Sequence, residues 1–182
     1  MALKSTIYKA DCQISDMDRG YYQLHHLTIA LHPSETEERM MARLLAFVIN
    51  ADEHLQFTKG LSTDDEPELW QKSLTDDIEL WIDVGMPDEK RIRKAANRAD
   101  KVILYTYSGR NTVWWSQIQP KLERFKNLTV INLPKVATDQ LAPMVKRTMQ
   151  LQISIQDSQI WLSDDQNTAT IVPEIWLCNS AI

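Results

Sequence analysis

The sequence is poor in the residues that build several common catalytic motifs. It holds four glycines in 182 residues, and none forms a Gly-rich phosphate loop or the Gly-x-Ser-x-Gly turn of a serine hydrolase. Its two cysteines, Cys12 and Cys178, are far apart and form no Cys-x-x-Cys pair. Each lies in a strand-like stretch, so we expect two buried free thiols and no disulfide.

Long hydrophobic runs are missing as well. The first residues, MALKSTIYKADCQIS, lack the apolar core of a signal peptide, and no apolar run approaches the length of a membrane span. Hydrophobic residues make up 43% and charged residues 25% of the chain, which is typical of globular proteins. We therefore expect a cytoplasmic protein with no membrane partner, folded as a single domain over residues 1–182.

The formal net charge of −5 argues against a protein that coats nucleic acid without selectivity. The charge is uneven along the chain, however. Residues 86–126 contain ten Lys and Arg against four Asp and Glu, whereas the remaining residues contain ten against 21. This basic segment is a candidate phosphate-facing surface, with nucleic acid as the partner. The alternative is a pair of solvated helices.

Hydrophobic periodicity predicts a mixed α/β (α+β) protein. A helix with an apolar stripe follows Ser34, and Glu37 completes a capping box with Ser34 as the N-cap. After this helix the pattern up to residue 134 predicts three strands and then a helix, a strand, a helix and a strand, and a further helix is expected over 137–149. Strands at both ends of the chain join the same sheet or form a second one; the pattern leaves both arrangements open.

The most informative stretch is EPELWQKSLTDDIELWIDVG, residues 66–85. It predicts two strands around a TDD turn, and Glu68 and Asp83 lie nearly symmetrically about that turn. In the matching register both carboxylates reach the open end of the hairpin. Paired carboxylates are the oxygen ligands that Mg²⁺ prefers, so Glu68 and Asp83 are candidate ligands of Mg²⁺ or Mn²⁺.

Metal-dependent nucleases with such a hairpin also use a lysine two residues after the second acid, and Gly85 stands there instead. The helix expected after Pro87 offers replacements. Helical angle favours Arg91 or Arg93 and directs Lys94 away from the hairpin, whereas Lys90 lies nearest the end of the strand. Arg91 is the first candidate and Lys90 the next.

One further carboxylate is a candidate. Glu38 lies in the first turn of the helix that follows Ser34, where it either faces a catalytic site or simply stabilises the positive end of the helix.

Seven segments resemble a known family: MALKSTIYKA, HPSETEERMMARLLAF, LQFTKGL, DDEPELW, LWIDVGMPDEKRI, RTMQLQ and IQDSQIWLSDD. In this order they make the whole chain similar to the YaeQ family of bacterial proteins. That family resembles an elaborated PD-(D/E)XK core, the restriction-endonuclease-like fold of a mixed sheet flanked by helices. The resemblance implies such a core with added strands at both termini. It also implies that Glu68 and Asp83 stand at the two acidic motif positions and Glu38 at a third acidic position.

Two hypotheses follow. In the first, the protein is a magnesium-dependent nuclease acting on DNA or RNA, with Glu38, Glu68, Asp83, Arg91 and Lys90 as catalytic residues. In the second, it is a catalytically inactive protein of nuclease fold that binds nucleic acid or a protein partner. Tyr105, Tyr107, Trp114 and Trp115 lie within the basic segment. They stack on bases or belong to the core, and we expect the core for Tyr105 and for at least one tryptophan.

Overall fold

The computed structural model describes residues 4–59 and 65–180, which fold into two compact units. The first unit comprises Met1–Val48 and Leu133–Pro173, and the second comprises Ile49–Asn132 and Glu174–Ile182. Each has its own sheet and its own covering helices. The prediction of a single domain over residues 1–182 stays a prediction.

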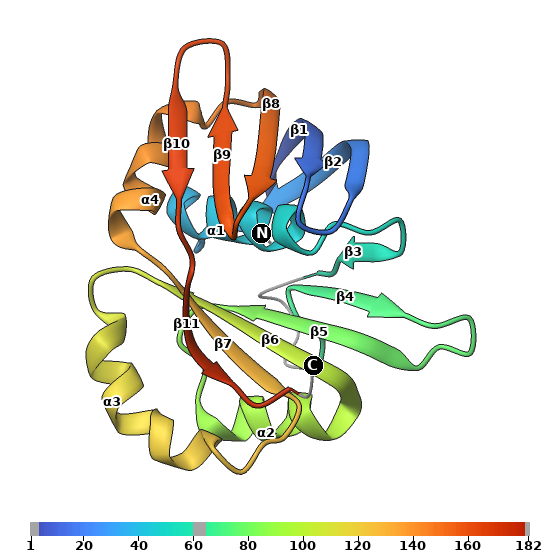
Figure 1. Ribbon diagram of the computed structural model, residues 1–182, viewed down its shortest axis with the longest axis vertical. Helices are drawn as coiled ribbons and strands as arrows, with labels where there is room; N and C mark the ends of the chain where they lie inside the picture. The colour runs from blue at the N-terminus through green and yellow to red at the C-terminus, as the bar shows by residue number, and fades with distance from the viewer. Residues whose placement is uncertain (1–3, 60–64, 181–182) are drawn as a thin grey trace. The chain divides into compact units, whose positions relative to one another are not determined.

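The first unit contains a five-stranded mixed sheet in the order β10-β9-β8-β1-β2 (Figure 1). β1 pairs antiparallel with β2 and parallel with β8, and β8, β9 and β10 form an antiparallel meander. The elements of this unit are β1 (Thr6–Asp16), β2 (Tyr21–Leu31), α1 (Glu37–Ile49), α4 (Lys135–Leu141), the 3₁₀ turn η2 (Ala142–Met144), β8 (Thr148–Gln156), β9 (Gln159–Ser163) and β10 (Thr168–Ile171).

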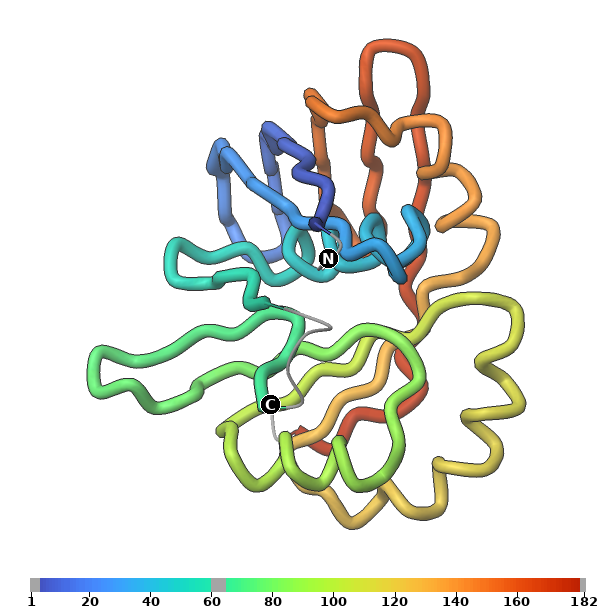
Figure 2. The backbone as a smooth tube through the Cα atoms, turned by 180° about the vertical axis from the view of Figure 1, so that it is seen from behind, coloured from blue at the N-terminus to red at the C-terminus, as the bar shows by residue number. Residues whose placement is uncertain are grey.

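Alternating side chains build the core of the first unit. Along β1 and β8 every second side chain is buried, as the two-residue period of a strand requires. Helix α1, buried from Met40 to Val48, runs along one face of the sheet (Figures 1 and 2). The ring of Phe47 on α1 meets that of His25 on β2 edge to face, with the centroids 5.1 Å apart. Each large apolar side chain buried here contributes about 1.5–3 kcal/mol.

The second unit contains a six-stranded sheet in the order β11-β7-β6-β5-β4-β3. β3, β4 and β5 are antiparallel neighbours, whereas β5 and β6 are parallel and are joined through α2. The elements are β3 (Leu55–Phe57), β4 (Leu69–Lys72), β5 (Ile78–Val84), α2 (Glu89–Arg98), β6 (Ala99–Tyr107), α3 (Asn111–Leu122), β7 (Leu128–Leu133) and β11 (Glu174–Cys178).

Helices α2 and α3 cover the same face of this six-stranded sheet (Figure 1). Ile92 on α2 and Leu122 on α3 belong to one buried cluster with Trp81 on β5 and Val102 on β6. The apolar face of α2 is narrow, as its sequence predicts, because Ile92 and Ala95 are its buried residues. This packing fixes the orientation of α2 against the end of β5.

The prediction of a mixed α+β fold is confirmed, and the structure chooses between the two arrangements that the pattern leaves open. The strands near the two ends of the chain form a second sheet, in which β1 pairs in parallel with β8. β11 is the exception, because it pairs with β7 at the edge of the six-stranded sheet. No helix in the described part of the chain is both long and apolar enough to span a membrane.

Two predictions about helices are wrong in detail. Ser34 is not the N-cap of α1: its hydroxyl bonds His32 at 2.6 Å, and Thr36 Oγ1 accepts the N–H of Arg39 instead. The helix expected over 137–149 begins at Lys135 and ends at Leu141, and residues 142–144 form a 3₁₀ turn. β8 then begins at Thr148. Pro143, which lacks a backbone N–H, lies in that 3₁₀ turn, where an α-helix cannot continue unperturbed.

The two cysteines are free thiols, as predicted, but they differ in exposure. Cys12 on β1 is buried and Cys178 at the end of β11 is exposed. The prediction of burial is therefore wrong for Cys178, because β11 lies at a sheet edge and all five of its residues retain solvent exposure.

Candidate functional site

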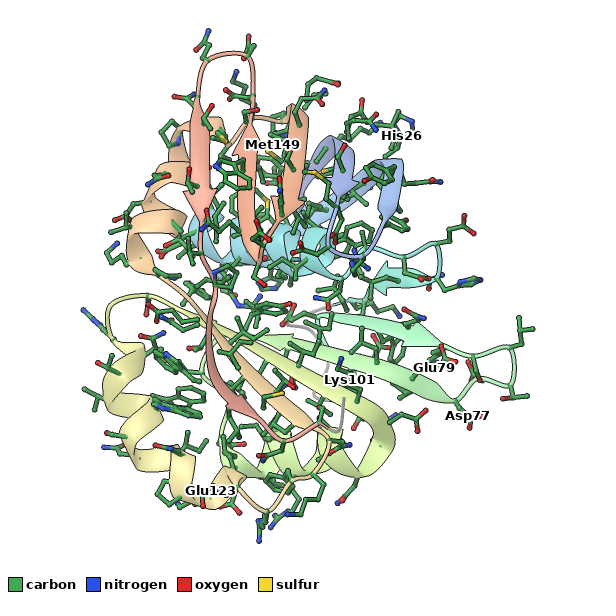
Figure 3. The ribbon with its side chains drawn as sticks, viewed as in Figure 1. His26, Asp77, Glu79, Lys101, Glu123 and Met149 are labelled. Carbon is green, nitrogen blue, oxygen red and sulfur yellow. The ribbon has the colours of Figure 1, made fainter. Side chains whose placement is uncertain are left out.

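The β4–β5 hairpin brings the two predicted acids to the same end. Leu69 pairs with Ile82, so Glu68 and Asp83 are the next residues outward on the two strands. The backbone N–H of Glu68 donates to the carbonyl of Ile82 at 3.0 Å, which fixes this end of the hairpin. Figure 3 shows Asp77 and Glu79 toward the opposite, turn end of the hairpin.

Both acids are buried. Only 4% of the surface of Glu68 and of Asp83 is accessible to solvent. A carboxylate in such a place is unstable unless positive charge or hydrogen-bond donors compensate it. The partners of these side chains therefore decide what the hairpin can do.

Arg91 on α2 is the partner of Asp83. Its Nε donates to Oδ2 at 3.0 Å and its Nη2 donates to Oδ1 at 2.9 Å, so the guanidinium holds both carboxylate oxygens. Nη2 also donates to the carbonyl of Glu66 at 3.0 Å. Such a two-pronged arginine–carboxylate pair is among the strongest charge-assisted contacts in proteins.

The start of α2 holds Arg91 in place. Asp88 is the N-cap of the helix, and its Oδ1 accepts the backbone N–H of Arg91 at 2.8 Å. The first turn of α2 therefore begins at a fixed point beyond β5, and the side chain of Arg91 spans back to Asp83. Of the replacements that the sequence offers for the missing lysine, the structure places Arg91 on the acid.

Gly85 explains why no lysine stands two residues after Asp83. Its φ is +121°, a backbone conformation that residues with a Cβ rarely adopt. Its N–H donates to the carbonyl of Tyr105 at 2.8 Å, which holds this conformation against β6. A Cβ added to Gly85 meets nothing within 4 Å, so the constraint is in the backbone and not in space.

A depression of about 580 Å³ opens beside Arg91. It is lined by Asp65, Asp88, Lys90, Arg91 and Lys94. The prediction that Lys94 points away from the site is therefore wrong. Residues three apart share a helix face, and Lys94 lines the same depression as Arg91. Lys90 and Arg93 are both exposed, and only Lys90 lines the depression.

Asp65 is a residue of this depression that the sequence did not single out. It forms an ion pair with Nζ of Lys94, and its carbonyl accepts a hydrogen bond from Nη1 of Arg98 at 2.6 Å. The hydrogen bond from Lys94 lowers the pKa of the exposed Asp65 carboxyl. The only sequence signal was the acidic stretch TDDEP before the hairpin, opposite the positive charges of α2.

Glu38 belongs to the first unit. It lies in the first turn of α1, and its Oε1 accepts a hydrogen bond from the hydroxyl of Thr138 on α4 at 3.1 Å. This contact ties α1 to α4 within the unit. The role of Glu38 as a third acid of the hairpin site stays a prediction.

The first unit also holds a buried ion pair, between Glu35 and Arg43, which is not among the residues predicted from the sequence. Glu35 accepts hydrogen bonds from Arg43, Nε to Oε1 at 2.7 Å and Nη2 to Oε2 at 2.8 Å. Arg39 adds a third contact to Oε1 at 2.9 Å. Glu35, Arg39 and Arg43 are four residues apart from one to the next, and side chains at this spacing lie on one face of a helix. This spacing is the sequence signal from which the contacts could be predicted.

Three aromatic residues of the basic segment, Tyr105, Trp114 and Trp115, contribute to packing. Tyr105 is fully buried and its hydroxyl accepts a hydrogen bond from Asn50 at 2.7 Å, so the prediction of a core role is confirmed. Trp114 and Trp115 pack against the buried cluster between α2, α3 and the sheet. Trp114 also donates its indole N–H to the carbonyl of Pro87 at 3.0 Å, which ties α3 to the start of α2.

The residues of the hairpin do not fit a divalent cation in this arrangement. Both oxygens of Asp83 accept hydrogen bonds from Arg91, and a cation bound to the same oxygens would lie against the guanidinium. Within residues 4–59 and 65–180, no three His, Cys, Asp or Glu side chains are grouped so as to hold a metal ion.

The fold and site define a mixed α+β protein with two mixed sheets and an arginine–aspartate pair, in which the aspartate is buried, at the end of a hairpin. The model of the family described as YaeQ protein matches residues 1–173. The chain therefore belongs to the YaeQ family.

Curated relatives agree with this assignment. The chain is 49% identical over 177 residues to a protein of Escherichia coli (strain K12) described as "Uncharacterized protein YaeQ", covering 97% of this chain and 98% of that one. The Salmonella typhi protein of the same description is 50% identical over 177 residues, with the same coverage.

Two solved structures share the fold. The crystal structure of the YaeQ protein from Xanthomonas axonopodis pv. citri matches with a TM-score of 0.92 and 45% identity, covering 96% of this chain and 99% of that one. The YaeQ protein from Pseudomonas syringae matches with a TM-score of 0.91 and 36% identity, covering 95% and 96%.

Proposed function

We propose that this protein binds the phosphate backbone of a nucleic acid at the depression beside α2, without metal-dependent cleavage. The observation that carries the proposal is the engagement of Asp83: both of its oxygens are held by Arg91. A nuclease hairpin needs this carboxylate for its cation, and here a side chain occupies it.

Magnitudes support this choice. Arg91 donates two hydrogen bonds to the Asp83 carboxylate, and hydrogen bonds to charged groups contribute about 1.5–3 kcal/mol each. Binding of a divalent cation with a Kd of about 1 mM supplies about 4 kcal/mol. A cation that displaced Arg91 from Asp83 would therefore gain little net free energy, and Arg91 is expected to keep its place at ordinary metal concentrations.

The cations around the depression supply the attraction for phosphate. Lys90 is exposed at the start of α2. Lys94 lies one turn further along the same face, and its ammonium group exchanges the exposed Asp65 carboxylate for a phosphate on binding. Arginine and lysine side chains that contact phosphates release counterions from the nucleic acid, and this release drives binding and makes it salt-dependent. The net charge of −5 restricts the attraction to this local surface.

Fluorescence anisotropy with labelled single- and double-stranded DNA and RNA tests the proposal in EDTA over a series of salt concentrations. The double variant Lys90→Ala, Lys94→Ala should bind about tenfold more weakly and lower the salt slope by about 2, since each phosphate contact contributes roughly one. Lys121→Ala is the matched control, because Lys121 is an exposed lysine of the same basic segment on α3. Equal affinities and slopes for the two variants would reject the depression as the binding surface.

A second candidate function is magnesium-dependent cleavage of DNA or RNA. One observation favours it: two buried carboxylates, Glu68 and Asp83, lie at the same end of one hairpin. In this case Arg91 replaces the missing lysine and leaves Asp83 when substrate binds. Cleavage in Mg²⁺ or Mn²⁺ that disappears in Asp83→Asn would establish this function in place of simple binding.

A further inference from the structure

We infer that the guanidinium of Arg91 is a tethered substitute for a metal ion, and that removing it turns the oxygen atoms around Asp83 into a divalent-cation site. Arg91 compensates the negative charge of Asp83 whether or not the protein binds nucleic acid.

The first step is the demand for positive charge. Asp83 is 4% exposed and lies in β5, an interior strand of the six-stranded sheet between β4 and β6. A buried carboxylate in such a place is stabilised by a bound cation or by a cationic side chain. Arg91 supplies that charge with two hydrogen bonds to the carboxylate.

The second step concerns the atoms that Arg91 contacts. Its described hydrogen bonds go to Oδ1 and Oδ2 of Asp83 and to the carbonyl oxygen of Glu66. Carboxylate and backbone carbonyl oxygens are the ligands that Mg²⁺, Mn²⁺ and Ca²⁺ use. Glu68, two residues after Glu66, is also buried and lies at the same end of the hairpin as Asp83, where its carboxylate is the next candidate donor.

The third step is the anchoring of the arginine. The N-cap bond from the Arg91 amide to Asp88 fixes the backbone from which the side chain extends. The carbonyl of Glu66 holds the far end of the guanidinium from a different segment of the chain. Arg91 is 26% exposed along its side chain, so water reaches the site when the side chain is shortened.

The test compares metal binding by the intact chain and by two variants, Arg91→Ala and Arg91→Gln. Mn²⁺ is the probe, because its free-ion electron paramagnetic resonance signal reports binding directly, and thermal unfolding is measured in parallel in Mg²⁺. The glutamine variant keeps much of the side-chain volume and is used if Arg91→Ala does not fold.

We expect the wild-type protein to show weak binding of Mn²⁺ and the Arg91 variants to bind at least tenfold more tightly. The variants should unfold at a lower temperature than wild type in EDTA and regain roughly 3–5 °C in metal at about ten times its Kd. Adding Asp83→Asn to an Arg91 variant should abolish both effects. Arg93→Ala is the control, because Arg93 is an exposed arginine of the same helix.

Two results would overturn the inference. Mn²⁺ binding by the wild-type protein that is as tight as in the variants and depends on Asp83 would mean that Arg91 does not occupy the cation position. Variants that fold but gain no affinity would mean that the oxygen atoms do not form a cation site. Neither result bears on nucleic-acid binding, which the Lys90 and Lys94 variants test separately.

Discussion

The backbone amide of Gly85 donates to the carbonyl of Tyr105 at 2.8 Å while the φ of Gly85 is +121°. Gly85 stands two residues after Asp83, the position at which the hypothesis of a metal-dependent nuclease expects a lysine. The chain turns away from β5 here in a conformation open to glycine and strained for other residues. The backbone conformation at position 85 therefore disfavours a lysine, because any residue with a Cβ is strained there.

A lysine introduced at position 85 should destabilise the protein. Gly85→Lys is expected to lower the free energy of unfolding by about 1–3 kcal/mol, because a residue with a Cβ is strained at this φ. Urea denaturation measures the loss. Gly85→Ala should lose a similar amount, since a Cβ there meets no neighbouring atom. A lysine variant as stable as wild type would show that the backbone does not require glycine.

The N-cap of α2 should be worth about 1 kcal/mol. Asp88→Ala removes the acceptor for the amide of Arg91 and should lower the free energy of unfolding by about 0.5–2 kcal/mol. Asp88→Asn retains an acceptor oxygen and should stay close to wild type in the same denaturation experiment. Equal losses in the two variants would indicate that the charge of Asp88, and not its capping bond, stabilises the helix.

The buried pair of the first unit should be essential for its stability. Glu35→Ala leaves Arg43, whose side chain is 5% exposed, without its carboxylate partner. We expect a loss of about 3–5 kcal/mol, as for other broken buried pairs. Glu37→Ala is the matched control, because Glu37 is an exposed acid in the first turn of α1. Circular dichroism during urea unfolding measures both variants, and a small loss in Glu35→Ala would contradict the account.

The two thiols should differ sharply in reactivity. Burial raises the pKa of Cys12 to about 12, so this thiol stays protonated and shielded at pH 8 in the folded protein. Cys178 is exposed. Iodoacetamide at pH 8 should therefore label one thiol in the folded chain and both in urea, as read by mass spectrometry. Labelling of the folded Cys178→Ser variant would contradict the assignment.

The raised pKa of Cys12 also predicts a pH dependence. Above the pKa of the unfolded thiol, near 9, the unfolded chain loses a proton that the folded chain keeps, so stability falls as pH rises toward 12. The slope from this group is about 1.4 kcal/mol per pH unit. Cys12→Ala should show a shallower decline between pH 9 and pH 10.5 than wild type. Parallel curves for the two proteins would show that Cys12 does not contribute.

Local patterns were enough to predict the hairpin. The turn residues and the two-residue period of β5 place Asp83 on the same side as Trp81, which packs in the cluster with α2. That pattern directs the carboxylate of Asp83 toward α2. The three-residue spacing of Arg91 and Lys94 likewise places both side chains on one helix face, so local sequence also contains the position of Lys94.

The pairing of strands that are far apart in the chain cannot be predicted from local sequence patterns. β1 lies in parallel register with β8, Lys9 beside Thr148, and no local pattern records a partner so distant along the chain. The cap of α1 failed for a different reason. Ser34 and Thr36 are both good capping residues, and the bond between Ser34 and His32 decides between them. The φ of Gly85 likewise depends on the neighbouring strand β6.

The most direct test of the account is to mix the purified protein with a labelled oligonucleotide in EDTA and, separately, in Mg²⁺ or Mn²⁺. Binding and strand length are followed in the same samples. Because Arg91 occupies both oxygens of Asp83, the account predicts binding that does not require the metal and an oligonucleotide that stays intact in both conditions. Cleavage that requires the metal and disappears in Asp83→Asn would contradict it.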